Sequence, residues 1–155
     1  MNVGYDKIGL LLRLDDRILL CRKSRGTTLL ILPGGCLEPG ETAEQCLTRE
    51  IHEELGDVDL SEIRYIGTYR DRAAGDLERI VQIALYEATL TGSPQPRSEI
   101  AELVWFGAEA GREQLSPSIR NKILPDLVAR GFLSSAWRSP SEPVSRGSNA
   151  LSTGP

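Results

Sequence analysis

One stretch of the chain, Gly35 to Gly56, constrains the fold more than any other. Thr42 followed three residues later by Gln45 is typical of a helix capping box, and Gly56 is a natural left-handed helix stop. The stretch therefore predicts a helix over residues 43–55. The apolar stripe of its first half is continued in the second half by three glutamates, Glu50, Glu53 and Glu54. We expect these carboxylates to face the side of the helix that packs on the rest of the fold.

Three carboxylates on a packed helix face need a counter-charge. Like charges four residues apart repel by a few tenths of a kcal/mol when exposed, and partial burial raises the penalty to several kcal/mol. Arg49 can neutralise one carboxylate, whereas a divalent cation can neutralise all three. Oxygen ligands favour Mg²⁺ or Mn²⁺ over Zn²⁺. The pattern predicts a magnesium site; the alternative is a solvated acidic face in which glutamates pair with arginine.

The rest of the chain predicts strands before and after this helix, and then a second helix. Strands are expected at residues 5–14, 18–21, 29–32, 63–70, 78–90 and 101–106, the first two as a β-hairpin. The second helix is expected to begin at Pro117 and end at Gly131, with Pro125 as a kink or break. This order predicts an α/β fold with a mixed sheet and helices packed on it.

The length and composition of the chain limit how many domains it can form and which kinds of partner it can bind. Its 155 residues fit one domain, expected over 1–133, while residues 134–155 are rich in Ser, Pro, Gly and Arg and predict a flexible tail. Deleting this tail is expected to leave the core stable. The net charge of −4 argues against a large nucleic-acid interface. Three cysteines without metal spacing predict free thiols in the cytoplasm, and we expect no membrane segment.

The acidic segment resembles the Nudix box: Gly, five residues, Glu, seven residues, Arg-Glu, an aliphatic residue, any residue, Glu-Glu, any residue, Gly and an aliphatic residue. The matching positions are Gly35, Glu41, Arg49, Glu50, Ile51, Glu53, Glu54 and Gly56. Asp57 departs from the final aliphatic position, with Val58 one place later. The surrounding order of strands resembles the family over residues 3–132. The resemblance implies a MutT-like α/β/α sandwich that hydrolyses a nucleoside diphosphate linked to another group.

The resemblance also implies roles for residues in the box. The implied Mg²⁺ ligands are the backbone carbonyl of Gly35 and the carboxylates of Glu50, Glu53 and Glu54. Glu53 is alternatively the base that activates water. Arg49 is implied to hold the glutamates in place by ion pairing, and Glu41 to support the loop.

Four residues outside the box are further candidates. Related enzymes often have an additional acidic residue before the last strand, as ligand or base, and Glu99 and Glu102 are the candidates here. Arg22 and Lys23 end a strand where related enzymes often keep a phosphate-binding arginine. The alternative for all four is an ordinary exposed surface charge.

The substrate is less constrained than the chemistry. Markers of ADP-ribose, dinucleoside polyphosphate, coenzyme A and NADH hydrolases are absent, which favours a nucleoside triphosphate or modified nucleotide cleaved to the monophosphate. ADP-ribose or a nucleotide sugar is the enzymatic alternative. A nucleotide sensor without activity is a third hypothesis, disfavoured because all box glutamates are present, and the isoprenoid diphosphate isomerase branch is a weak fourth. The sequence is compatible with a homodimer.

Overall fold

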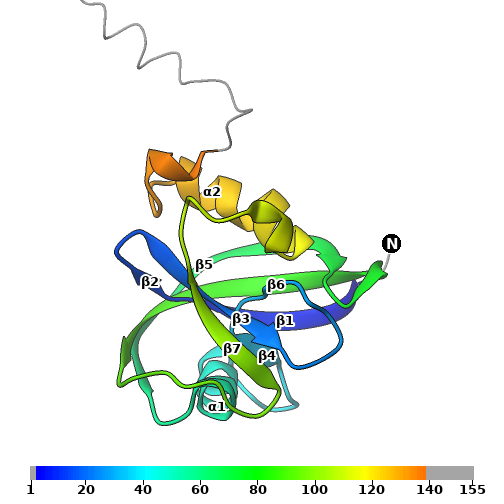
Figure 1. The fold of residues 1–155 in the computed structure, drawn as a ribbon. Helices are drawn as coiled ribbons and strands as arrows, with labels where there is room; N and C mark the ends of the chain where they lie inside the picture. The colour runs from blue at the N-terminus through cyan, green and yellow to red at the C-terminus, as the bar shows by residue number, and fades with distance from the viewer. Residues whose placement is uncertain (1–2, 139–155) are drawn as a thin grey trace, which may run out of the picture.

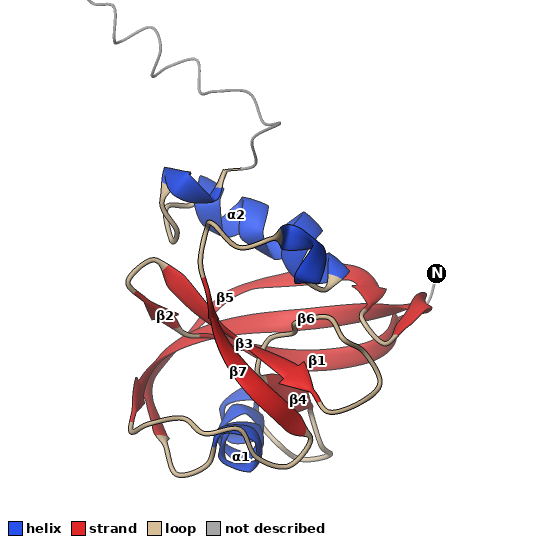
Figure 2. Cartoon of the chain, in the orientation of Figure 1, coloured by secondary structure: helices blue, strands red, loops and turns tan. Residues whose placement is uncertain are grey.

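The structure is a computed structural model, and it describes residues 3–138. Helix α1 (Ala43–Leu55) lies on one side of the strands and α2 (Leu124–Ala129) on the other (Figures 1 and 2). Each helix covers its own apolar cluster. Leu47 and Ile51 of α1 belong to one cluster, and Leu124 and Leu127 of α2 belong to the other. This is the predicted sandwich of helices and strands.

The strands form two sheets. The larger has the order β4-β1-β6-β5, made of Gly34–Cys36, Val3–Leu11, Asp76–Thr91 and Asp59–Ala73. The smaller has the order β2-β3-β7, made of Arg13–Leu14, Arg17–Lys23 and Ile100–Phe106. β1 runs parallel to β6, and the other pairs are antiparallel. The predicted mixed sheet is therefore confirmed, although the strands divide between two sheets.

The start of the chain differs from the predicted hairpin. β1 pairs with β4 and β6, and only the short β2 forms a hairpin with β3. Residues 29–32 do not form the expected strand, because Leu30 and Ile31 make only isolated bridges to Leu115 and Cys21. The strand in this region is β4, which begins at Gly34, two residues after the end of the expected strand. Gly34 has φ 138°, and a side chain there would strike the backbone carbonyl of Ile8 on β1. Glycine thus lets this segment approach β1.

The two helices follow the predicted signals. Thr42 caps α1 by accepting from the N–H of Gln45 at 3.1 Å, while the Gln45 side chain accepts from the N–H of Thr42 at 2.9 Å. In the second helical segment, residues 119–123 form a π-turn, in which the N–H of Leu124 bonds to the carbonyl of Ile119. Pro125 follows directly. Because proline has no N–H to donate, the predicted disturbance of this helix is present as a widened turn.

The packed part of the chain continues beyond the boundary expected at residue 133. Residues 135–137 form a 3₁₀ turn, and the side chain of Trp137 is completely buried beside Phe106. The indole N–H of Trp137 donates to the carbonyl of Asp16 at 2.9 Å, and the Ser134 hydroxyl pairs with the Asp16 carboxylate at 2.6 Å. The expectation that everything after 133 is a tail is wrong for residues 134–138. Residues 139–155 of that tail lie outside the described residues.

No helix within the described range 3–138 is long and apolar enough to cross a membrane.

Candidate active site

Arg49 on α1 connects the helix to the loop that precedes it. Its guanidinium binds both carboxylate oxygens of Glu41, at 2.6 and 2.9 Å, and donates to Glu50 at 3.2 Å and to the Cys36 carbonyl at 3.2 Å. The hydrogen bond from Arg49 and a backbone N–H from Glu38 lower the pKa of Glu41 to about 2. Glu41 is therefore ionised at neutral pH, and this ion pair fixes the loop relative to α1.

Glu50 and Glu54 lie one helical turn apart, against the backbone of Gly34 and Gly35. The N–H of Gly34 donates to Glu54 at 2.9 Å. The Glu50 carboxylate lies so close to Gly35 that a side chain at that position would overlap it. Burial raises the pKa of Glu50, although the neighbouring Arg49 opposes this effect. The carboxylates of Glu50 and Glu54 therefore lie together beside the Gly34–Gly35 backbone, at the first residues of β4.

Glu53 departs from the expected arrangement. Its side chain is 54% exposed, compared with 16% for Glu50, and its nearest charged partner is Arg49 at 3.6 Å. Position 53 lies away from the buried side of α1, which is set by Leu47, Ile51 and Leu55. The expectation that all three carboxylates face the packed side is therefore wrong for Glu53. In the part of the chain that the structure describes, no three His, Cys, Asp or Glu side chains form a ready-made metal cluster.

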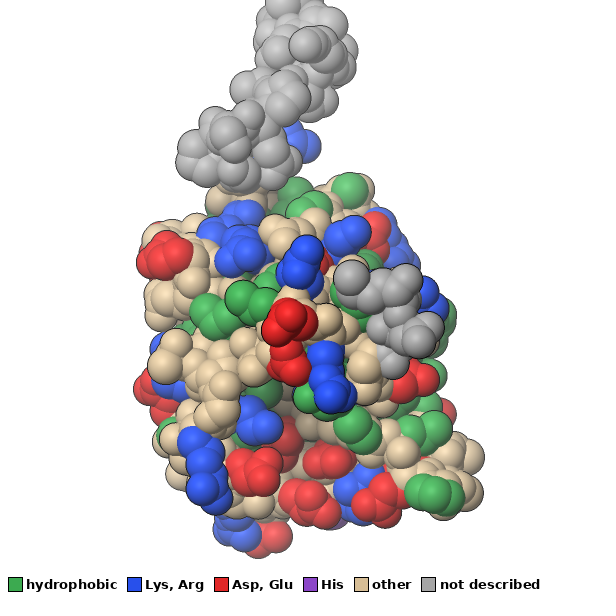
Figure 3. All heavy atoms as spheres, turned by 90° about the vertical axis from the view of Figure 1, so that its right-hand side faces the viewer, with side chains coloured by type: hydrophobic (Ala, Val, Ile, Leu, Met, Phe, Trp, Pro, Cys, Tyr) green, Lys and Arg blue, Asp and Glu red, His purple; other side chains and the backbone are tan. Residues whose placement is uncertain are grey.

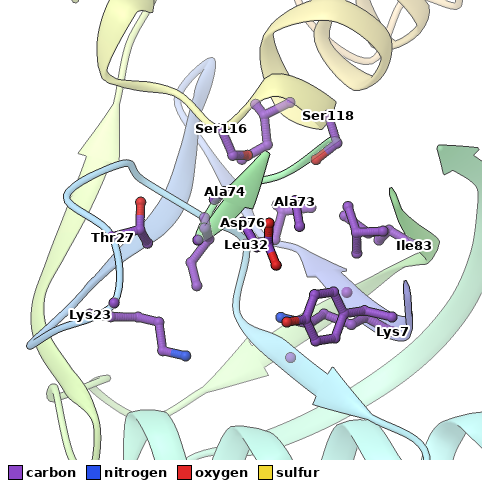
Figure 4. A pocket seen from close by; sticks show the side chains of 18 of the residues that line it. Lys7, Lys23, Thr27, Leu32, Ala73, Ala74, Asp76, Ile83, Ser116 and Ser118 are labelled. Carbon is purple, nitrogen blue, oxygen red and sulfur yellow. The ribbon is translucent and has the colours of Figure 1, made fainter. Parts of the chain in front are cut away.

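Beside Glu54 the fold encloses a cavity of about 350 Å³. Lys7 and Lys23 lie at one end of this cavity, and Ser116 and Ser118 lie at the opposite end (Figure 4). Burial raises the pKa of Glu54 to about 7, and the charge of Glu50 adds to this effect, while the Gly34 N–H and the two lysines oppose it. On the face drawn in Figure 3, acidic and basic side chains gather around a hollow in its lower half.

The candidates outside the box separate into two pairs. Lys23 lines the cavity and lies 3.8 Å from the exposed carboxylate of Glu99. Arg22 does not line the cavity; its guanidinium contacts Glu102 at 2.5 Å and the Thr28 carbonyl at 2.5 Å. Of the four candidates, only Lys23 lines the cavity, and Glu99 lies beside it through the Lys23 contact.

Sequence reasoning missed Lys7, Ser116 and Ser118. A lysine inside the expected strand 5–14 is a signal that could have been used, because lysine is rarely placed in a packed strand without a function; in the structure Lys7 is half-buried in β1. The register pairs Lys7 with Cys36, next to the candidate ligand Gly35. No comparable signal existed for the two serines, because serine before a helix is an ordinary capping residue.

The residues at the end of β4 fit a hard divalent cation. They offer carboxylate oxygens from Glu50 and Glu54 and a backbone carbonyl at Gly35, which are the oxygen donors that Mg²⁺ and Mn²⁺ prefer. Glu54 is a partly buried carboxyl with a raised pKa, and a cation beside it would favour its ionised form. The space against Gly35 exists only because this residue has no side chain.

Comparisons with known proteins agree with this geometry. The family described as NUDIX domain matches residues 6–127. The NAD-capped RNA hydrolase NudC of Vibrio cholerae is 35% identical over 123 residues, covering 75% of this chain and 44% of that protein. NudC of Vibrio atlanticus is 47% identical over 57 residues, covering 36% of this chain and 21% of that protein. The chain thus spans less than half the length of these relatives.

Solved structures share the fold. The MutT Nudix hydrolase of Burkholderia pseudomallei has a TM-score of 0.65 at 26% identity, covering 75% of this chain and 92% of that one. A Nudix hydrolase from Nitrosomonas europaea has a TM-score of 0.67 at 22% identity, covering 81% and 89%, which supports the fold alone. The domain match over most of the described chain decides the family. The chain belongs to the Nudix hydrolases.

Proposed function

We propose that the chain is a Mg²⁺-dependent pyrophosphohydrolase that cleaves a nucleoside diphosphate linked to another group. One observation carries the proposal: Glu54, which accepts from the Gly34 N–H beside Glu50, also lines a cavity that contains Lys7 and Lys23. Carboxylates for a metal and lysines for phosphate oxygens at one end of a cavity suit a metal-bound diphosphate.

The metal ligands in this proposal are the carboxylates of Glu50 and Glu54 and the carbonyl of Gly35. Glu53 becomes a further ligand, after rotation of its exposed side chain, only if another carboxylate is the base. When bound, Mg²⁺ or Mn²⁺ would neutralise charge on the diphosphate and acidify a coordinated water. Arg49 is a positioning residue, because its pairs with Glu41 and Glu50 hold the acidic face in place. Its planar guanidinium makes these contacts simultaneously, which a lysine could not do.

Glu53 is the proposed general base. Its side chain is solvent-exposed on the same helix as the two ligands, so it is free to accept a proton from a water bound near them. Glu99 is the second candidate, because it lies at the edge of the cavity beside Lys23. Glu102 is less suited, because its carboxylate pairs with Arg22 away from the cavity.

Replacing the two candidate bases distinguishes them. Glu53→Gln is expected to lower kcat about 100-fold, the size of a general-base contribution. Its melting temperature should not change, because the side chain is 54% exposed. If Glu53 is the base, Glu99→Gln, at a side chain that is 78% exposed, should change kcat less than about threefold. Steady-state release of the nucleoside monophosphate with excess Mg²⁺ measures both variants. If Glu99→Gln strongly lowered kcat while Glu53→Gln kept a near-normal kcat, the general base would be Glu99 and not Glu53.

A nucleoside triphosphate or modified nucleotide, cleaved to the monophosphate and pyrophosphate, is the proposed substrate. The cavity of about 350 Å³ lies at the small end of the usual range for ligand sites, which suits a single nucleoside. ADP-ribose or a nucleotide sugar is the alternative. The V. cholerae relative is an NAD-capped RNA hydrolase, and this similarity supports the alternative in which the substrate of this chain contains a diphosphate between two nucleosides.

A nucleotide panel assayed with and without Mg²⁺ tests the function. Nucleoside triphosphates, ADP-ribose and NAD are incubated with the protein, and the products are identified by mass spectrometry. Metal-dependent release of a nucleoside monophosphate supports the proposal, and the preferred substrate decides between the alternatives. Tight binding of nucleotides without turnover of any of them would contradict the proposal and identify a sensor.

A further inference from the structure

We propose that Ser116 and Ser118 form a hydrogen-bonding subsite that determines which heterocyclic base the cavity accepts. The inference rests on the proposed function, since it assigns the nucleoside end of the same substrate. It adds two specificity-determining residues that lie outside the Nudix box, in the segment leading into the second helix.

Both serines are buried, and both line the cavity. Their exposed fractions are 4% for Ser116 and 2% for Ser118, and they are two of the three buried polar residues among those described. No side-chain hydrogen bond joins either hydroxyl to another residue in the described range 3–138. In the same range, every side-chain oxygen or nitrogen that is fully shielded from solvent has a hydrogen-bond partner. Because the two serine hydroxyls have no such partner, they are accessible to solvent. Both residues line the cavity, so a ligand in the cavity can bind their hydroxyls.

The walls between the two ends of the cavity suit a flat ring. Leu32, Val81, Ile83 and Ile119 supply apolar surface. Ala73, Ala74 and Gly75 are small, and a side chain at Gly75 would lie 3.4 Å from the carbonyl oxygen of Gly26 on the facing loop. Apolar walls with a few polar groups at one end are typical of a site that binds and orients a heterocycle.

The charged residues of the cavity determine which end of the ligand binds at which end of the cavity. Lys7 and Lys23 lie at the opposite end of the cavity from the serines (Figure 4). Glu54, which accepts from the Gly34 N–H, also lines the cavity. Asp76 also lines the cavity, but its carboxylate pairs with Arg79 at 3.2 Å. The ligand therefore has phosphate at the lysine end and an uncharged, hydrogen-bonding edge at the serine end. A serine hydroxyl can donate or accept, so it can pair with the edge of a base.

The test combines a double substitution with a panel of bases. Ser116→Ala with Ser118→Ala removes both hydroxyls and should lower kcat/KM for the preferred nucleotide about 10- to 100-fold, the effect of losing two neutral hydrogen bonds. The loss should appear in KM, with kcat within about threefold, because the serines lie away from the reacting phosphates. The preference among bases should weaken by a similar factor. Ser61→Ala, at an exposed serine of β5, is the control and should change neither value.

Calorimetric binding of nucleoside 5′-monophosphates separates this inference from the proposed function. Serine-dependent discrimination among the monophosphates supports the subsite even if the protein hydrolyses no member of the panel. If the wild type hydrolyses nucleotides and the double variant keeps the same base preference and affinity, the subsite is refuted while the function stands. Should the double variant not fold, each single variant is measured instead, with an expected loss of about 2- to 10-fold. Unchanged preference in both single variants would equally refute the subsite.

Discussion

Glu54→Gln is expected to lower turnover about 1000-fold and at the same time to stabilise the metal-free protein at alkaline pH. The carboxylate is a proposed metal ligand, and several kcal/mol of transition-state stabilisation depend on the metal. Glutamine keeps the oxygen that accepts from the Gly34 N–H but removes the charge. Activity and stability therefore change in opposite directions, which a merely structural role would not produce.

The pH dependence follows from the raised pKa of Glu54. Its pKa in the folded protein is about 7, compared with 4.5 for an unperturbed glutamate. Between these values the folded state holds a proton that the unfolded state has released, so the free energy of unfolding falls as the pH rises. Over this window the metal-free wild type should lose about 3 kcal/mol relative to Glu54→Gln. Below the unfolded value, the two proteins should have similar stability.

Urea denaturation in EDTA across this pH range measures the difference in stability. Glu44→Gln, at an exposed glutamate in the first turn of the same helix, is the matched control and should show neither the pH-dependent gain nor the loss of turnover. A Glu54→Gln variant with normal turnover would contradict its proposed role as a ligand. A pH-independent difference in stability would show that the Glu54 carboxyl is not perturbed as described.

Trp137→Ala is expected to destabilise the protein by about 3–5 kcal/mol, the usual loss for a buried large aromatic side chain. Trp137 is completely buried, packs against Phe106 and donates to the carbonyl of Asp16. Truncation after residue 133 removes the same contacts and should have an effect at least as large. This reverses the expectation that the chain after 133 can be deleted without loss.

The same denaturation assay, in the presence of EDTA, measures this second effect. Leu77→Ala is the control, because the Leu77 side chain is 53% exposed, and it should change the free energy of unfolding by less than about 0.5 kcal/mol. If Trp137→Ala were as mild as this control, the indole would contribute nothing to the core. Activity measured at low temperature should survive in Trp137→Ala, because the indole lies in the cluster under α2, away from Glu54.

Local signals predicted the elements that depend on local chemistry. The capping box of Thr42 and the stop at Gly56 define α1 correctly, and Pro125 lies next to the disturbed turn of the second helix. The predictions were wrong where contacts between distant parts of the chain determine the structure. Trp137 lies in a polar-looking stretch, and its burial depends on the distant Asp16 and Phe106. Similarly, Leu30 and Ile31 were expected in a strand, but they form only isolated β-bridges, to Leu115 and Cys21, which the local sequence does not indicate.

The candidate site was predictable as a set of residues but not as an arrangement. The resemblance implied that Arg49 pairs with the glutamates, and the apolar stripe of the helix predicted that Glu50 and Glu54 face inward; the structure has both features. The helical wheel could not resolve Glu53, because position 53 lies just outside one edge of the arc spanned by the buried residues of α1, whereas positions 50 and 54 lie inside it. Lys7 and Ser118 reach the cavity from segments remote in sequence, so no local pattern could group them with the box.

Anomalous diffraction from crystals soaked in Mn²⁺ with a non-hydrolysable nucleotide analogue tests the central claim most directly. The claim is that the acidic face of α1 and the end of β4 together hold a divalent cation at the diphosphate. The predicted result is a manganese peak between the carboxylates of Glu50 and Glu54 and the carbonyl of Gly35, in contact with the analogue's phosphates. Manganese bound elsewhere, with these carboxylates open to water, would contradict the account.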